Sequence, residues 1–131
     1  MSILHLHAAV RALLPAGVTH YLGQAPDDAE APWLVSGFER QETEISEASL
    51  PLSFTDALTV TVAALTEDQA NFILDAVCEA LIGARVTVEG WQVGAIQPPY
   101  VRGPYPAGLK ATDTDLRFQV IRATFGFTVS R

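Results

Sequence analysis

Two segments in which apolar and polar residues alternate constrain the fold of this chain most. Residues 58–63 place leucine and valine at every second position, with threonine or alanine between them. Residues 116–129 alternate in the same way. Because successive side chains of a strand point to opposite faces, both segments are predicted to be half-buried strands. The apolar phase of the second segment changes near Val120 and Ile121, which predicts a bulge or bend there.

A helix between these two strands is predicted by its cap and its period. Thr66 and Gln69 have the spacing of a capping box, and Gly83 follows the expected end of the helix. The apolar positions recur at helical spacing and form one predicted core stripe: Ala70, Ile73, Leu74, Val77 and Leu81. A second helix is predicted over residues 3–14, where apolar residues recur at similar spacing before Pro15.

The remaining segments are predicted as short strands and connectors. Residues 18–22 and 33–38 have strand character, and residues 39–51 are an acidic stretch that suggests a connector. Residues 86–93 suggest a hairpin that turns at Glu89-Gly90. The order of elements predicts an α+β fold: a mainly antiparallel sheet with two helices packed on it, in a single domain over residues 1–131.

Residues 97–115 separate two strand-like segments but have neither a helical nor an alternating period. They include four prolines, two glycines and two tyrosines. A loop of this length is unusual in a small domain unless it has a function, so we interpret it as a long contact loop. Its candidate contact residues are Tyr100, Arg102, Tyr105 and Lys110. Single-stranded nucleic acid would need more cations than these two, so a protein partner is the better interpretation.

Phe72 is a further candidate contact residue. On the helical wheel it lies nearly opposite the core stripe, beside Asp68, Asp75 and Glu79. One explanation is an isolated exposed apolar side chain, which is common on protein surfaces. A second is cover by a loop of the same subunit. The explanation we favour is burial by a neighbouring subunit or by another partner.

The distribution of charge is uneven along the chain. The net charge is −7, which argues against general binding to nucleic-acid backbones. Residues 1–99 hold 13 acidic and 3 basic side chains, whereas residues 100–131 hold 2 acidic and 5 basic ones. Ordinary solvated surface would explain this split. The alternative is a subunit whose acidic face meets the basic face of the next subunit, head to tail.

The sequence predicts no catalytic, cofactor-binding or metal site. The three histidines have no metal-ligand spacing, and no nucleophile-elbow or phosphate-binding glycine motif is present. No apolar run approaches the roughly 20 residues that a membrane span needs. The single Cys78 cannot form an internal disulfide and is interpreted as a small buried side chain. We therefore expect a protein that is not an enzyme and has no membrane partner.

The chain as a whole resembles the tail terminator (tail completion) family of long-tailed bacteriophages. The resemblance lies in the order of short segments over nearly the full length rather than in one motif. The segments are Leu13-Leu14-Pro15-Ala16-Gly17-Val18, Tyr21-Leu22-Gly23, Pro26-Asp27-Asp28, Pro32-Trp33-Leu34-Val35, Gly90-Trp91-Gln92-Val93 and Phe125-Gly126-Phe127-Thr128-Val129.

This resemblance implies a ring-forming structural subunit of the virion. Such a hexameric ring ends polymerisation of the tail tube and provides the surface to which the head attaches. The implied partners are further copies of the chain, the tail-tube protein and head–tail connector proteins, with DNA only as cargo through the ring. The implied location is the head-proximal end of the tail, after synthesis in the bacterial cytoplasm. The alternatives are a head-side connector or stopper subunit and, from a different class, a small cytosolic ligand-binding domain or enzyme.

Overall fold

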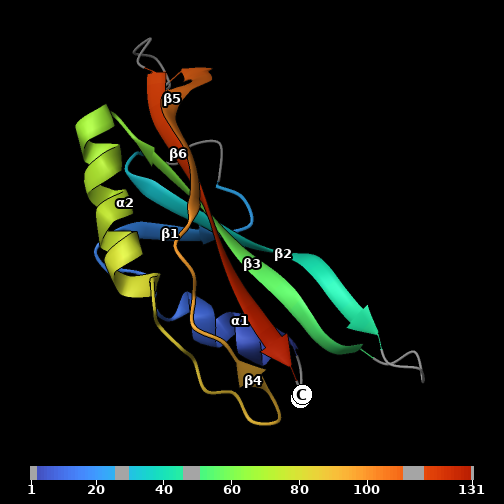
Figure 1. The fold of residues 1–131 in the computed structure, drawn as a ribbon. Helices are drawn as coiled ribbons and strands as arrows, with labels where there is room; N and C mark the ends of the chain where they lie inside the picture. The colour runs from blue at the N-terminus through green and yellow to red at the C-terminus, as the bar shows by residue number, and fades with distance from the viewer. Residues whose placement is uncertain (1–2, 26–29, 46–50, 111–116, 131) are drawn as a thin grey trace.

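The computed structural model describes residues 3–25, 30–45, 51–110 and 117–130. The N-terminal helix α1 and the central helix α2 span Ile3–Arg11 and Glu67–Leu81. The strands, in chain order, are β1 (Thr19–Leu22), β2 (Trp33–Ile45), β3 (Pro51–Ala64), β4 (Gln92–Val93), β5 (Tyr100–Lys110) and β6 (Arg117–Ser130). These elements form a single α+β domain, as the sequence predicts (Figure 1).

The strands form one six-stranded, strongly twisted sheet in the order β1-β2-β3-β6, with β4 and β5 both beside β6 (Figure 1). β1 and β2 run parallel, and all other pairs are antiparallel. The two long strands β3 and β6 pair without a break from Ser53↔Ser130 to Ala64↔Gln119. The prediction of a mainly antiparallel sheet is therefore confirmed.

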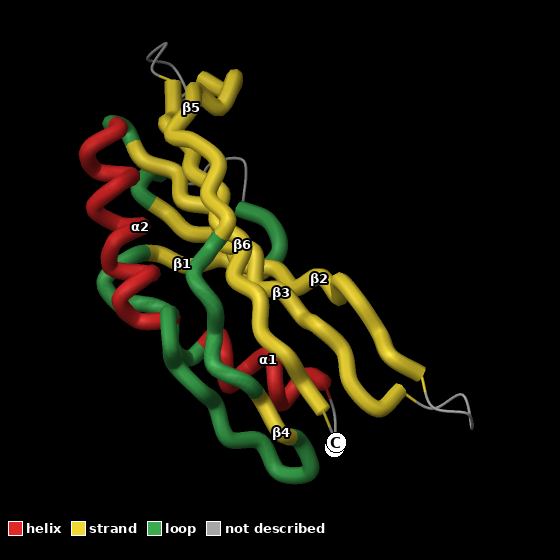
Figure 2. The backbone as a smooth tube through the Cα atoms, in the orientation of Figure 1, coloured by secondary structure: helices red, strands yellow, loops and turns green. Residues whose placement is uncertain are grey.

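Both helices pack on the same face of this sheet, as Figure 2 shows. Leu6 and Val10 of α1 join one apolar cluster with the core stripe of α2, all of whose five predicted members are buried. From the sheet, the cluster receives every second residue of β3 from Leu58 to Ala64 and of β6 from Ile121 to Val129. The alternation in the sequence therefore identifies the covered face of each strand correctly.

The predicted ends of α2 agree with its capping contacts. The Thr66 side-chain oxygen accepts a hydrogen bond from the Gln69 backbone N–H at 3.1 Å. The Gln69 side chain in turn accepts from the backbone N–H of Leu65 at 3.1 Å, one residue before the cap. Gly83 follows the helix with a φ of +79°, a left-handed conformation that favours glycine. Local sequence therefore determines where this helix begins and ends.

The prediction that residues 97–115 are a loop is wrong for residues 100–110. They form β5, which pairs with β6 from Tyr100↔Thr124 to Lys110↔Arg117 and has two register shifts. The prolines are tolerated because β5 is an edge strand, where a residue without an N–H need not break a ladder on its open side. Residues 111–115 of the predicted loop lie outside the described part of the chain.

Three other strand predictions need correction. The segment expected to be an acidic connector continues β2 as far as Ile45, because its backbone pairs with β3. The change of apolar phase near residues 120–121 leaves the pairing of β6 with β3 regular, and the irregularity at this place is a register shift in the pairing with β5, between Arg102↔Arg122 and Tyr105↔Val120. The predicted hairpin keeps only its bridge between Val88 and Trp91, since Val93 pairs with Val129 of β6 rather than with Val86.

Candidate contact surfaces

The sheet face opposite the helices is the first candidate surface, and we call it the open face. One row of directly paired residues crosses five strands of this face: Tyr21, Val35, Thr61, Arg122 and Arg102. The central members of the row are only half-buried, whereas their neighbours Val60 and Val62 on the covered face are fully buried. The open face is thus available to a partner over the width of the sheet.

A shallow hollow of about 300 Å³ lies on the open face. Its wall includes Val35 and Gly37 of β2, Thr59 and Thr61 of β3, and Arg122 of β6. A Cβ atom added at Gly37 would have no heavy atom within 4 Å, which fits open space above β2. The hollow has room for a side chain of a partner.

Two arginines lie directly opposite each other on the open face. Arg102 of β5 pairs with Arg122 of β6, and both side chains are exposed. Like charges directly opposite in a sheet destabilise it. No carboxylate within the described part of the chain forms an ion pair with either guanidinium. This pair therefore forms a basic site that an acidic partner would stabilise.

The outer side of α2 is the second candidate surface. Phe72 is 76% exposed, so no loop among the described residues covers it. Asp68, Asp75 and Glu79 are exposed too, and they lie with Phe72 along one stripe at helical spacing. We call these four residues the acidic stripe. The helix has no basic residue in its last turn, so Glu79 lies uncompensated near the negative end of the helix dipole.

The predicted contact residues are thus divided between the two surfaces. Tyr100, which is 71% exposed, and Arg102 lie on β5, and Phe72 lies on α2. For Tyr105 and Lys110 the structure gives the backbone position on β5, but their side chains lie outside the described part. Contact by any of these residues stays a prediction. Sequence reasoning missed Arg122, because its place opposite Arg102 depends on long-range pairing.

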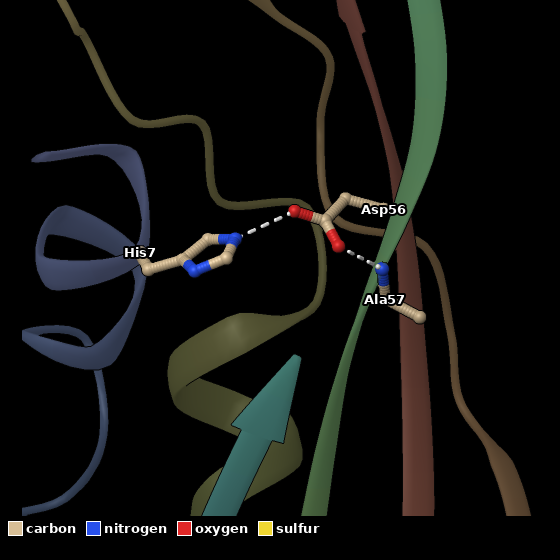
Figure 3. Close-up of polar contacts among 3 residues, drawn as sticks. All are labelled: His7, Asp56 and Ala57. Carbon is tan, nitrogen blue, oxygen red and sulfur yellow. Dashed lines mark hydrogen bonds and ion pairs between the residues drawn. The ribbon is translucent and has the colours of Figure 1, made fainter. Parts of the chain in front are cut away.

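A polar network joins α1 to the sheet on the covered face. The His7 ring lies 2.9 Å from an Asp56 carboxylate oxygen, measured from Nε2 (Figure 3). The other carboxylate oxygen of Asp56 accepts the Ala57 backbone N–H at 2.9 Å. On its flat side, His7 stacks on Phe38 with ring centroids 3.7 Å apart. Asp56 is only 2% exposed, so its partners compensate for the burial of a carboxylate.

A second part of this network is centred on Ser36, which is fully buried. Its hydroxyl accepts a hydrogen bond from Arg11 Nε at 3.1 Å and lies 2.6 Å from His20 Nε2. Ser36 contacts His20, whereas Asp56 contacts His7. The geometry is therefore not that of a Ser-His-Asp relay. The network fastens α1 and β1 to β2 and β3, so His7 and His20 both have structural partners in the sheet.

The pKa of His20 leads to a prediction about stability. Burial lowers this pKa below its ordinary value of 6.5, and the positive charge of Arg11 lowers it further. Since the unfolded chain then binds a proton more readily than the native state, stability falls as the pH drops through about 6.5. Between about pH 7.5 and about pH 5, we expect the melting temperature of the His20→Gln variant to decrease less than that of the wild type. If calorimetry shows equal decreases in melting temperature for the two proteins, this role for His20 is wrong.

Within the described part of the chain, no group of three or more His, Cys, Asp or Glu side chains could hold a metal ion. None of the helices described is long and apolar enough to cross a membrane.

Comparison with known proteins gives one family and one fold. The family model described as Tail completion protein gp17 matches residues 2–121. No curated protein matches the chain. Among the matching solved structures is a chain of the "Virion of native gene transfer agent (GTA) particle", with a TM-score of 0.66 and 18% identity. The match covers 96% of this chain and 95% of that chain, and at this identity it shows a shared fold.

Proposed function

The chain belongs to the tail completion protein gp17 family and is a structural protein of a phage tail, and we propose that it caps the tail tube as a closed ring of six copies. In this role the ring ends tube polymerisation at the head-proximal end and offers its other side to the head–tail connector proteins. DNA passes through the ring as cargo. The observation that carries the proposal is the family match over nearly the whole chain.

The two candidate surfaces support a ring of identical copies. The acidic stripe lies on the helix layer, and the paired arginines lie on the opposite, open face of the sheet. Two different and complementary surfaces on one subunit favour a head-to-tail contact, which closes into a ring when the rotation between neighbours permits. A two-fold dimer would instead use the same surface on both copies.

Control of tube length is the direct test of this function. Tail-tube protein of the same phage is polymerised with and without the purified chain, and tube lengths are measured by electron microscopy. We expect shorter tubes of stable length, and the chain should sediment with them in a small amount that does not grow with tube length. Unchanged tube growth, with no chain in the pellet, would contradict the proposal. Binding only to connector proteins of the head would favour the head-side stopper alternative.

A further inference from the structure

We propose that the acidic stripe of α2 in one subunit docks on the open sheet face of the next subunit, with Phe72 entering the hollow beside Thr61. This inference rests on the proposed ring and names the contact that closes it. The occupant of the open face is a second copy of this chain, because the chain itself has the complementary charge and an unburied aromatic anchor.

Each surface contains like charges that destabilise the isolated subunit. Asp75 and Glu79 lie four residues apart on α2, and like charges at this spacing disfavour a helix. Arg102 and Arg122 lie directly opposite on the sheet, which is also unfavourable. In each case a partner of opposite charge removes the repulsion. The two repulsive pairs have opposite sign, so one contact between neighbouring copies relieves both.

The spacing of the side chains along the acidic stripe also matches the spacing of the arginines on the open face. Along a helix that rises about 1.5 Å per residue, Asp75 lies about 4.5 Å and Glu79 about 10.5 Å beyond Phe72. Neighbouring strands of a sheet are about 4.8 Å apart. Arg122 lies one strand beyond Thr61, at about 4.8 Å, and Arg102 lies two strands beyond Thr61, at about 9.6 Å. A helix laid across the strands with Phe72 above Thr61 therefore brings Asp75 to Arg122 and Glu79 to Arg102.

Phe72 supplies the apolar part of this contact. Aromatic side chains that fill a pocket at the centre of an interface contribute most of its affinity, and surrounding charges add specificity. The hollow provides such a pocket at a place where Gly37 leaves the sheet uncovered. We expect Phe72→Asp to weaken association by about thirtyfold or more, while the melting temperature of the subunit changes little because the side chain is exposed.

Disulfide trapping tests the contact directly. In a Cys78→Ala background, Phe72→Cys and Thr61→Cys are combined, and the protein is oxidised after assembly on tail tubes. We expect a ladder of covalent multimers on a non-reducing gel. The matched control replaces Thr61→Cys with Thr87→Cys, because Thr87 is an exposed threonine outside the open face. This control should remain monomeric, and equal ladders from both pairs would overturn the inference.

Charge exchange provides the second test. Asp75→Arg with Glu79→Arg, and separately Arg102→Glu with Arg122→Glu, should each abolish rings at the concentration at which the wild type assembles. The protein with all four changes should form rings again, because it restores opposite charges across the contact. If rings persist in every variant, this contact is wrong although the ring stands. The same conclusion follows if the variant with all four changes forms no rings and the cysteine pair gives no disulfide ladder. If the wild type never forms a ring, the proposed function fails as well.

Discussion

Replacing Phe125 with alanine is expected to cost roughly 3–5 kcal/mol of unfolding free energy, the range typical of a fully buried phenylalanine. Phe125 is 0% exposed and lies in the apolar core cluster between the helices and the sheet. Its loss would leave a cavity that the two long strands can fill only in part. Urea unfolding followed by circular dichroism gives the free energy directly.

The neighbouring residue is the matched control for Phe125. Thr124 lies one position earlier on β6 and points to the open face, so Thr124→Ala should change the unfolding free energy by no more than about 0.5 kcal/mol. This pair of variants tests which face of β6 the helices cover. Similar losses in both variants would contradict the assignment of the open face, and with it the proposed contact between subunits.

Asp56→Ala is expected to cost roughly 2–3 kcal/mol, because hydrogen bonds to a charged group contribute roughly 1.5–3 kcal/mol. The substitution removes the acceptor of the Ala57 backbone N–H and the partner of His7, both on the covered face. The His7 ring and the buried Ala57 N–H would then lack the carboxylate that they contact. The same urea titration measures the loss.

Two further variants are controls for the Asp56→Ala measurement. Asp56→Asn keeps an oxygen that can accept the Ala57 N–H, so it should lose less stability than the alanine variant. Asp75→Ala removes an exposed carboxylate from α2 and should lie within about 0.5 kcal/mol of the wild type. If Asp56→Ala is as stable as Asp75→Ala, the network does not fasten α1 to the sheet.

The sequence predicts those parts of the fold that depend on local pattern. The cap at Thr66, the stripe from Ala70 to Leu81 and the exposure of Phe72 all follow from a 3.6-residue period and from capping chemistry. The covered face of β3 follows from its period of two. These features need only residues that are near one another in the chain.

Features that depend on long-range pairing could not be predicted in the same way. β5 has no alternating pattern, and its prolines and glycines suggest a loop, yet β6 provides a strand for it to pair with. Asp56 interrupts an apolar phase, but its carboxylate forms a hydrogen bond with His7 from a helix far away in the sequence. The same reasoning applies to the open face, where Arg122 and Arg102 meet only after the sheet has formed.

The proposed position of the protein at the end of the tail tube can be measured most directly by gold labelling. Tails purified before head attachment would carry a C-terminal tag on this chain, and gold particles that bind the tag would be located by electron microscopy. The account predicts label at one end of each tube only, at the end opposite the tail tip. Label along the tube, label at the tip or unlabelled tubes would contradict the account.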